Sequence, residues 1–158
     1  GKPVLGQVYK HKEELGKDPI QVAPAAVAMA TKDFAWMSWL WDAVMYPINK
    51  PTPEQNKLFI DETLKQRNLV DLDWGIACFN MGEGNNLYAD GDKSIHLVKC
   101  PVLSIWSKND YVVLEYMVKE TVAALGDKAK LIVYEKGGHS PVIDNLAQLT
   151  EDVVKFAR

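Results

Sequence analysis

KLIVYEKGGHSPVIDN, residues 130–145, passes from an apolar run to a pair of glycines, a histidine and a proline. The run KLIVYE predicts a strand, and the segment from Val142 to Ala157 predicts a helix. Gly137 and Gly138 have no Cβ and can adopt backbone angles that other residues resist. The loop between the strand and the helix can therefore turn sharply. We therefore expect His139 to be presented at the end of a strand.

The same order of elements comes immediately before this stretch. CPVLSIWSKND, residues 100–110, contains the apolar run Val102 to Trp106, which predicts a strand that leads into a loop. Residues 111–126 predict a helix that ends at Gly126. Strand, loop and helix repeated at this spacing predict an α/β fold with two parallel strands joined by a right-handed crossover.

The first part of the chain is helical in pattern and rich in aromatic side chains. Residues 22–45 predict one or two helices, and Pro47 follows their end. The next helix is predicted to start with Thr52 as its N-cap and Pro53 at its first helical position. A short helix then gives way to glycines and asparagines at residues 82–86.

Composition excludes several classes of protein. The 158 residues are 47% apolar and 25% charged with a net charge of −3, which is typical of a globular protein. The acidic balance without a Lys/Arg cluster argues against nucleic-acid binding, and no apolar stretch reaches the roughly 18 residues of a membrane span. Cys78 and Cys100 are interpreted as core residues of a protein in a reducing, cytoplasmic compartment, with a single disulfide as the open alternative.

Two titratable side chains follow the two predicted strands. Asp110 lies four residues beyond the first strand, and His139 lies four residues beyond the second. Functional residues of parallel α/β sheets gather at the carboxyl ends of the strands, so we expect these two to meet at one sheet edge. A carboxylate there accepts the Nδ1 proton of the imidazole and stabilises the imidazolium that forms when Nε2 takes a proton. Either residue alone would more often be incidental, but the paired placement favours a catalytic acid and histidine.

CPVLSIWSKND and KLIVYEKGGHSPVIDN, each followed by a helix, resemble the C-terminal end of an α/β-hydrolase-fold protein. The resemblance implies that Asp110 is the acid after the seventh strand of that fold and His139 the histidine after the eighth. By position and composition, the aromatic helical region resembles the lid that these enzymes insert after the sixth strand. The resemblance thus implies an N-terminal segment with a helical lid at residues 1–97 and the C-terminal βαβα part of the core at residues 98–158.

The chain departs from the family at two places. The glycine that often follows the seventh strand is replaced by Ser107, Lys108 and Asn109, and no segment fits the G-x-S-x-G elbow that carries the nucleophile. Cys78, with small residues on one side only, is a poor substitute. Two strands alone also leave both sheet edges unpaired. We therefore interpret the chain as a fragment, or as one piece of a cleaved protein, whose partner is the N-terminal half of the same fold.

The resemblance implies hydrolysis of an ester bond, or less often of an amide or another acyl bond, without a metal or organic cofactor. Asp110 would orient His139, and His139 would act first as general base and then as general acid. Trp36, Trp39 and Trp41 cannot all face one side of a helix. A core role is favoured for each, although an aromatic lid would suit an apolar acyl or aryl group of a small substrate.

Three alternatives stay open at the level of sequence. The same fold includes non-catalytic proteins that bind a small molecule under the lid. An aspartate nucleophile outside this chain would give chemistry of the dehalogenase or epoxide-hydrolase type. The third alternative is a stand-alone interaction domain that presents the tryptophan-rich helices to a partner.

Overall fold

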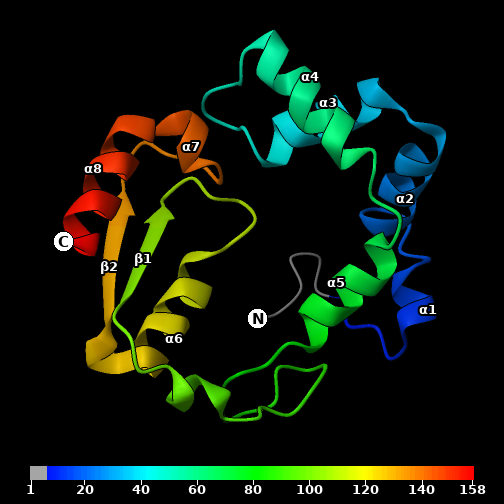
Figure 1. Cartoon of the computed structure of the whole chain (residues 1–158). Helices are drawn as coiled ribbons and strands as arrows, with labels where there is room; N and C mark the ends of the chain where they lie inside the picture. Colours follow the sequence, from blue (N-terminus) through cyan, green and yellow to red (C-terminus); the bar gives the residue numbers. More distant parts are fainter. Residues whose placement is uncertain (1–6) are drawn as a thin grey trace. The chain divides into compact units, whose positions relative to one another are not determined.

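The computed structural model describes residues 7–158, which form eight α-helices and two β-strands together with two short 3₁₀ turns (Figure 1). In chain order the elements are α1 (Lys12–Leu15), α2 (Val22–Thr31), α3 (Phe34–Val44), α4 (Pro53–Thr63), α5 (Leu69–Cys78), β1 (Val102–Ser107), α6 (Glu115–Leu125), β2 (Ala129–Tyr134), α7 (Pro141–Asp144) and α8 (Leu146–Ala157). The 3₁₀ turns are Ser94–Leu97 and Gly126–Lys128. The mixed α/β class expected from the order of elements is confirmed.

The chain divides into two compact units. The first unit runs to Met37 and resumes from Lys57 to Ile95, and the second unit combines Ser38–Asn56 with His96–Arg158. The helices α3 and α4 therefore each contribute to both units. The predicted division at residues 97 and 98 refers to sequence regions, and it stays a prediction.

In the first unit, α5 contacts both α1 and α2. The buried apolar side chains of this unit are Leu15, Val22, Ala25, Ala28, Met29, Met37, Ile60 and Leu64. Asp18 is buried just before α2, where its Oδ1 accepts hydrogen bonds from the backbone N–H groups of Ile20 at 2.9 Å and Gln21 at 2.6 Å. The carboxylate thus satisfies two backbone donors in the turn that leads into the helix.

The segment for which the sequence left one or two helices open forms two. The break is at Lys32, which has a φ of 59° and a ψ of 37°, the left-handed conformation that ends many helices. The next helix begins after Asp33, whose Oδ1 accepts the N–H of Trp36 at 2.9 Å. This side chain provides the local start signal for α3.

The predicted start of α4 is confirmed. The N–H of Gln55 donates to Oγ1 of Thr52 at 3.3 Å, and the N–H of Thr52 donates to Oε1 of Gln55 at 2.9 Å. This reciprocal pair is a capping box, in which each side chain satisfies a backbone donor of the other residue. Pro53 occupies the first helical position, where its missing N–H costs nothing.

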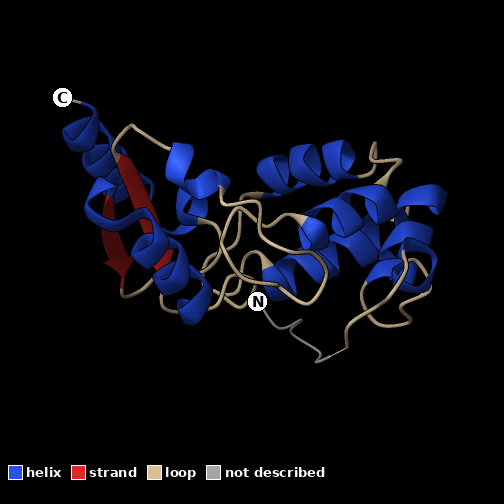
Figure 2. Ribbon diagram, turned by 90° about the horizontal axis from the view of Figure 1, so that it is seen from below, coloured by secondary structure: helices blue, strands red, loops and turns tan. Residues whose placement is uncertain are grey.

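The second unit contains the parallel pair of strands that the sequence predicts. Val102 pairs with Ala129, and the register continues to Ser107 opposite Tyr134. The crossover helix α6 contacts both strands, and the hydroxyl of Tyr134 donates to Oδ2 of Asp152 on α8 at 2.9 Å. Figure 1 shows α8 alongside β2, and Figure 2 shows helices beside both strands.

Two helix boundaries differ from the prediction. The crossover helix begins at Glu115 rather than at Tyr111, because the N–H groups of Val112 and Val113 donate to the side chain of Asp110 instead of entering a helix. The final helix is split into α7 and α8 at Asn145, whose φ of −138° is not helical. Both differences lie next to the predicted site residues.

No helix among residues 7–158 combines the length and the apolar character needed to cross a lipid bilayer.

Candidate active site

The two strands end side by side, and this brings the loops that follow them together. Ser107 and Tyr134 are the last residues of β1 and β2 and are directly paired. Asp110 follows three residues after the first strand, and His139 follows five residues after the second. The Nδ1 atom of His139 lies 3.0 Å from both carboxylate oxygens of Asp110. The structure thus brings together the two residues that the sequence paired.

The carboxylate of Asp110 is buried and fixed by its own loop, with a relative exposure of 9%. Its Oδ1 accepts the backbone N–H groups of Val112 at 2.8 Å and Val113 at 2.9 Å. Its own N–H donates to the carbonyl of Ser107 at 3.1 Å. The oxygens are therefore held toward the imidazole before any reactant arrives.

His139 has one ring nitrogen on Asp110 and a ring that is partly open to solvent. Its side chain is 23% exposed, against 8% for that of Asp110. Because an ionised carboxylate can only accept hydrogen bonds, Nδ1 carries the proton in this pair. In the neutral ring, Nε2 is then an acceptor, which is the tautomer that a general base requires.

Asn109 ties the acid loop to the histidine loop. Its backbone N–H and its side-chain Nδ2 donate to the carbonyl of Gly137 at 3.2 Å and 3.3 Å. The neighbouring N–H of Lys108 donates to the carbonyl of Tyr134 at 3.0 Å, which extends the strand pairing. In the sequence alone Asn109 is only a departure from the family glycine, because its hydrogen-bond partner lies on the other loop.

The glycine pair is needed for close packing rather than for unusual backbone angles. A Cβ at Gly137 would lie 2.4 Å from Oδ1 of Asn145 and 2.6 Å from Oγ of Ser107. A Cβ at Gly138 would lie 2.8 Å from Cγ of Pro47. Neither glycine has a positive φ, so the expectation that they supply special angles is wrong. What they provide is space beside the histidine.

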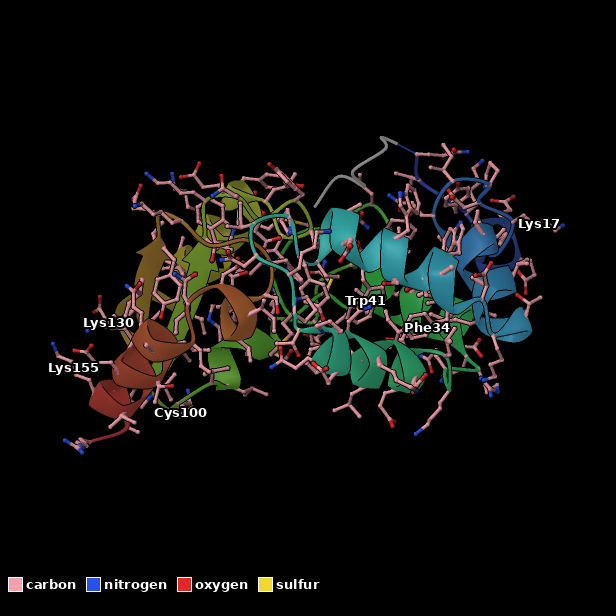
Figure 3. All side chains as sticks on the ribbon, turned by 90° about the horizontal axis from the view of Figure 1, so that it is seen from above. Lys17, Phe34, Trp41, Cys100, Lys130 and Lys155 are labelled. Atoms are coloured by element: carbon pink, nitrogen blue, oxygen red, sulfur yellow. The ribbon has the colours of Figure 1, made fainter. Side chains whose placement is uncertain are left out.

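The three tryptophans proposed to bind substrate have different environments on α3. Trp39 is 63% exposed, whereas Trp36 and Trp41 are half-buried. Trp36 lines an open pocket of about 380 Å³ in the first unit. Trp41, labelled in Figure 3, packs its ring against that of Tyr46 in the second unit, with centroids 6.0 Å apart. Their role in substrate binding stays a prediction.

The cysteines do not behave as a pair. Both are free thiols; Cys78 is half-buried and Cys100 is exposed in the loop that leads into β1 (Figure 3). The interpretation of Cys100 as a core residue is therefore wrong, because the apolar run begins only after it. Within the part of the chain that the structure describes, no group of three or more His, Cys, Asp or Glu side chains is placed to hold a metal ion.

No family model matches this chain, and no curated protein matches its sequence. The resemblance to α/β hydrolases therefore rests on its own residues and on the geometry of Asp110 and His139.

Proposed function

We propose that this chain supplies the acid and the histidine of an ester hydrolase that resembles the α/β-hydrolase family. The observation that carries the proposal is the contact of Nδ1 of His139 with both carboxylate oxygens of Asp110, at 3.0 Å each. The contact lies just beyond the carboxyl ends of two paired parallel strands, the place where α/β proteins carry their sites.

The chemistry divides between this chain and a second polypeptide. A serine hydroxyl on that polypeptide attacks the ester carbonyl while Nε2 of His139 takes the hydroxyl proton. The tetrahedral intermediate then expels the alkoxide, which receives that proton from Nε2 and leaves as the alcohol. In the second half, water gives a proton to Nε2 and attacks the acyl carbonyl. The resulting tetrahedral intermediate expels the serine oxygen, which takes the proton back from Nε2, so that the acid and the free serine are released. Asp110 keeps the ring oriented and stabilises each imidazolium.

The sheet of the second unit supports the need for that second polypeptide. Within residues 7–158, β1 and β2 pair only with each other. Val102–Ile105 are only half-buried, whereas strands inside a parallel sheet are covered on both faces. The fully buried apolar side chains described in this unit are Tyr46, Trp106, Leu125 and Tyr134. We therefore propose the N-terminal half of the same fold, carrying the nucleophile, as the partner.

The substrate class follows from the aromatic helix. Trp39, which belongs to the same unit as Asp110 and His139, is exposed and offers apolar surface of the kind that binds an acyl or aryl group. We propose a small ester with an apolar acyl or aryl part as the substrate.

A serine-reactive fluorophosphonate probe, read on a gel of the purified chain with whatever co-purifies, tests the proposal. We expect the label on a second polypeptide, because this chain carries no nucleophile elbow. Absence of both the label and the second polypeptide would contradict the proposal. Turnover of an epoxide or an alkyl halide without a label would instead indicate the aspartate-nucleophile alternative.

The roles of Asp110 and His139 are tested in the complex of this chain with the second polypeptide. We expect D110N to lower the kcat for a p-nitrophenyl ester by about 10⁴-fold, because the imidazole loses the partner that fixes its tautomer. H139Q should lower it at least as much. The control D127N changes an exposed carboxylate on the turn after α6 and should leave kcat unchanged. Full activity in D110N would contradict the assignment of Asp110 as the acid.

A further inference from the structure

The carboxylate of Asp144, the last residue of α7, joins two segments that are distant in the sequence. Its Oδ2 accepts the N–H of Gly138 at 2.7 Å, and its Oδ1 accepts the N–H of Asn49 at 3.0 Å. Gly138 immediately precedes His139, and Asn49 lies 95 residues away from Asp144 in the connection between α3 and α4. All of these residues belong to the second unit.

The two segments also meet directly. Pro47 approaches Gly138 so closely that a Cβ there would lie 2.8 Å from Cγ and 3.1 Å from Cδ of the proline ring. Gly138 itself is buried. Pro47 and the carboxylate of Asp144 both lie against the backbone in front of His139, since the same Cβ would lie 3.2 Å from Oδ2 of Asp144. A movement of Pro47 toward this backbone has to displace it, because the close approach leaves no space between them.

The bond pattern suits a positioning role better than a helix-capping role. Asp144 ends α7 rather than starting it, and both of its donors come from outside the helix. Each oxygen serves a different segment, so only a side chain with two acceptor oxygens can make both bonds. Hydrogen bonds to an ionised acceptor are about twice as strong as neutral ones, which favours a carboxylate at this position.

We propose that Asp144 is a positioning residue for His139, and that it makes the placement of the imidazole depend on the segment from Pro47 to Asn49. The inference rests on the proposed function, since the placement matters for catalysis only if His139 is the base. Asp144 itself touches neither reactant nor imidazole; it acts through the backbone N–H of Gly138. A displacement of the connection that follows the tryptophan-rich α3 is thereby transmitted to the pair of His139 and Asp110.

Nuclear magnetic resonance of the ¹⁵N-labelled 158-residue chain, at a concentration at which sedimentation shows a monomer, tests this inference without requiring catalysis. The first readout is the exchange with water of the Nδ1 proton of His139, which the contact with Asp110 protects. The second is the exchange of the backbone amide protons of Gly138 and Asn49. D110N serves as the reference in which the Nδ1 proton has lost its carboxylate partner.

In D144N we expect both amide protons and the Nδ1 proton of His139 to exchange about tenfold faster, because one charged acceptor is replaced by a single neutral oxygen. D144E keeps both oxygens and should restore part of the protection. The control D127N should match the unsubstituted chain. D144N preserves the size of the side chain, and its thermal midpoint shows whether the fold is retained.

Three results would overturn the inference. The first is an Nδ1 proton in D144N that exchanges at the rate of the unsubstituted chain. The second is faster exchange spread equally over amides of both units, which would mean a general loss of stability. The third is an unsubstituted chain without a protected Nδ1 proton. The fluorophosphonate label is a separate test of the proposed function. A failure of the proposed function can therefore be distinguished from a failure of the positioning role of Asp144.

Discussion

Close packing next to the pair of Asp110 and His139 leaves little room for a larger side chain. Gly137 accepts two hydrogen bonds from Asn109 at its carbonyl, and its Cα faces the side chains of Ser107 and Asn145. The Oδ1 atom of Asn145 is buried there without a hydrogen-bond partner among the described residues. Polar atoms of the two loops are thus packed at van der Waals distance, with no room for an additional methyl group.

The substitution G137A should destabilise the protein by about 1–3 kcal/mol, the usual effect of overpacking. The new Cβ would lie 2.4 Å from Oδ1 of Asn145 and 2.6 Å from Oγ of Ser107. Urea denaturation followed by circular dichroism measures the change. The matched control is G75A on α5, where a Cβ meets nothing within 4 Å and where alanine should stabilise the helix by up to about 1 kcal/mol. Equal effects at both glycines would contradict the packing argument.

At the scale of elements, the sequence predicted what local signals and the order of the strands determine, and it missed contacts between segments that no strand pairing brings together. The pairing of Asp110 with His139 could be predicted because parallel strands place their carboxyl ends together. The bonds of Asp144 could not be predicted, since Asn49 lies 95 residues away. The late start of α6 had a local signal in Asp110, whose side chain competes with the helix for nearby amides.

The capping box of α4 gives a prediction for a helix start. T52A removes the acceptor for the N–H of Gln55 and should destabilise the protein by about 1 kcal/mol. Thermal unfolding of T52A and of a control variant, each compared with the unsubstituted chain, provides the measurement. The control T121A changes an exposed threonine inside α6, where alanine has the higher helix propensity and should not destabilise. An unchanged midpoint in T52A would show that the cap contributes nothing.

The hydrogen bond between Tyr134 on β2 and Asp152 on α8 predicts how the stability of the protein depends on pH. Tyr134 is 1% exposed, and burial, together with the hydrogen bond to Asp152, raises the pKa of its phenol to about 12. Because the folded pKa lies above the ordinary value of 10.0, the neutral phenol is favoured by folding. This stabilisation is complete below pH 10 and is lost as the pH rises from 10 toward 12.

We therefore expect Y134F to be less stable than the unsubstituted chain at pH 7, by about 1 kcal/mol for the lost hydrogen bond. The difference should shrink above pH 10, because only the tyrosine has a proton to lose there. Denaturant titrations of both chains from pH 7 to pH 11 measure how the free energy of unfolding of each chain changes with pH. An equal change of the free energy of unfolding in both chains would contradict the assignment of the stability lost above pH 10 to Tyr134.

At the scale of the whole molecule, the second unit exposes several large apolar side chains. Its exposed large apolar side chains include Val133 on β2 and Leu146, Val153, Val154 and Phe156 on α8. The two strands pair only with each other within residues 7–158, which leaves backbone hydrogen-bonding groups on both outer edges. Such edges and apolar side chains favour association with further polypeptide.

We expect the 158-residue chain by itself to associate as its concentration rises, and to bind a fluorescent apolar dye. Sedimentation velocity over a range of concentrations measures the first effect. Addition of the proposed N-terminal half should suppress both, since it would pair with the strand edge. A chain that stays monomeric and unfolds cooperatively without dye binding would favour the stand-alone interaction domain.

The contact between Asp110 and His139 and the contact between Asn49 and Asp144 join residues at different separations in the sequence, and this difference has a consequence for folding. Asp110 and His139 are 29 residues apart, whereas Asn49 and Asp144 are 95 residues apart. Closing the longer loop costs about 1 kcal/mol more in chain entropy, since the cost rises with the logarithm of loop length. The shorter closure is thus favoured to form first on the folding pathway. A newly made chain would assemble its acid and histidine before the distant segment docks, so the final adjustment of the imidazole belongs to the last stage of folding.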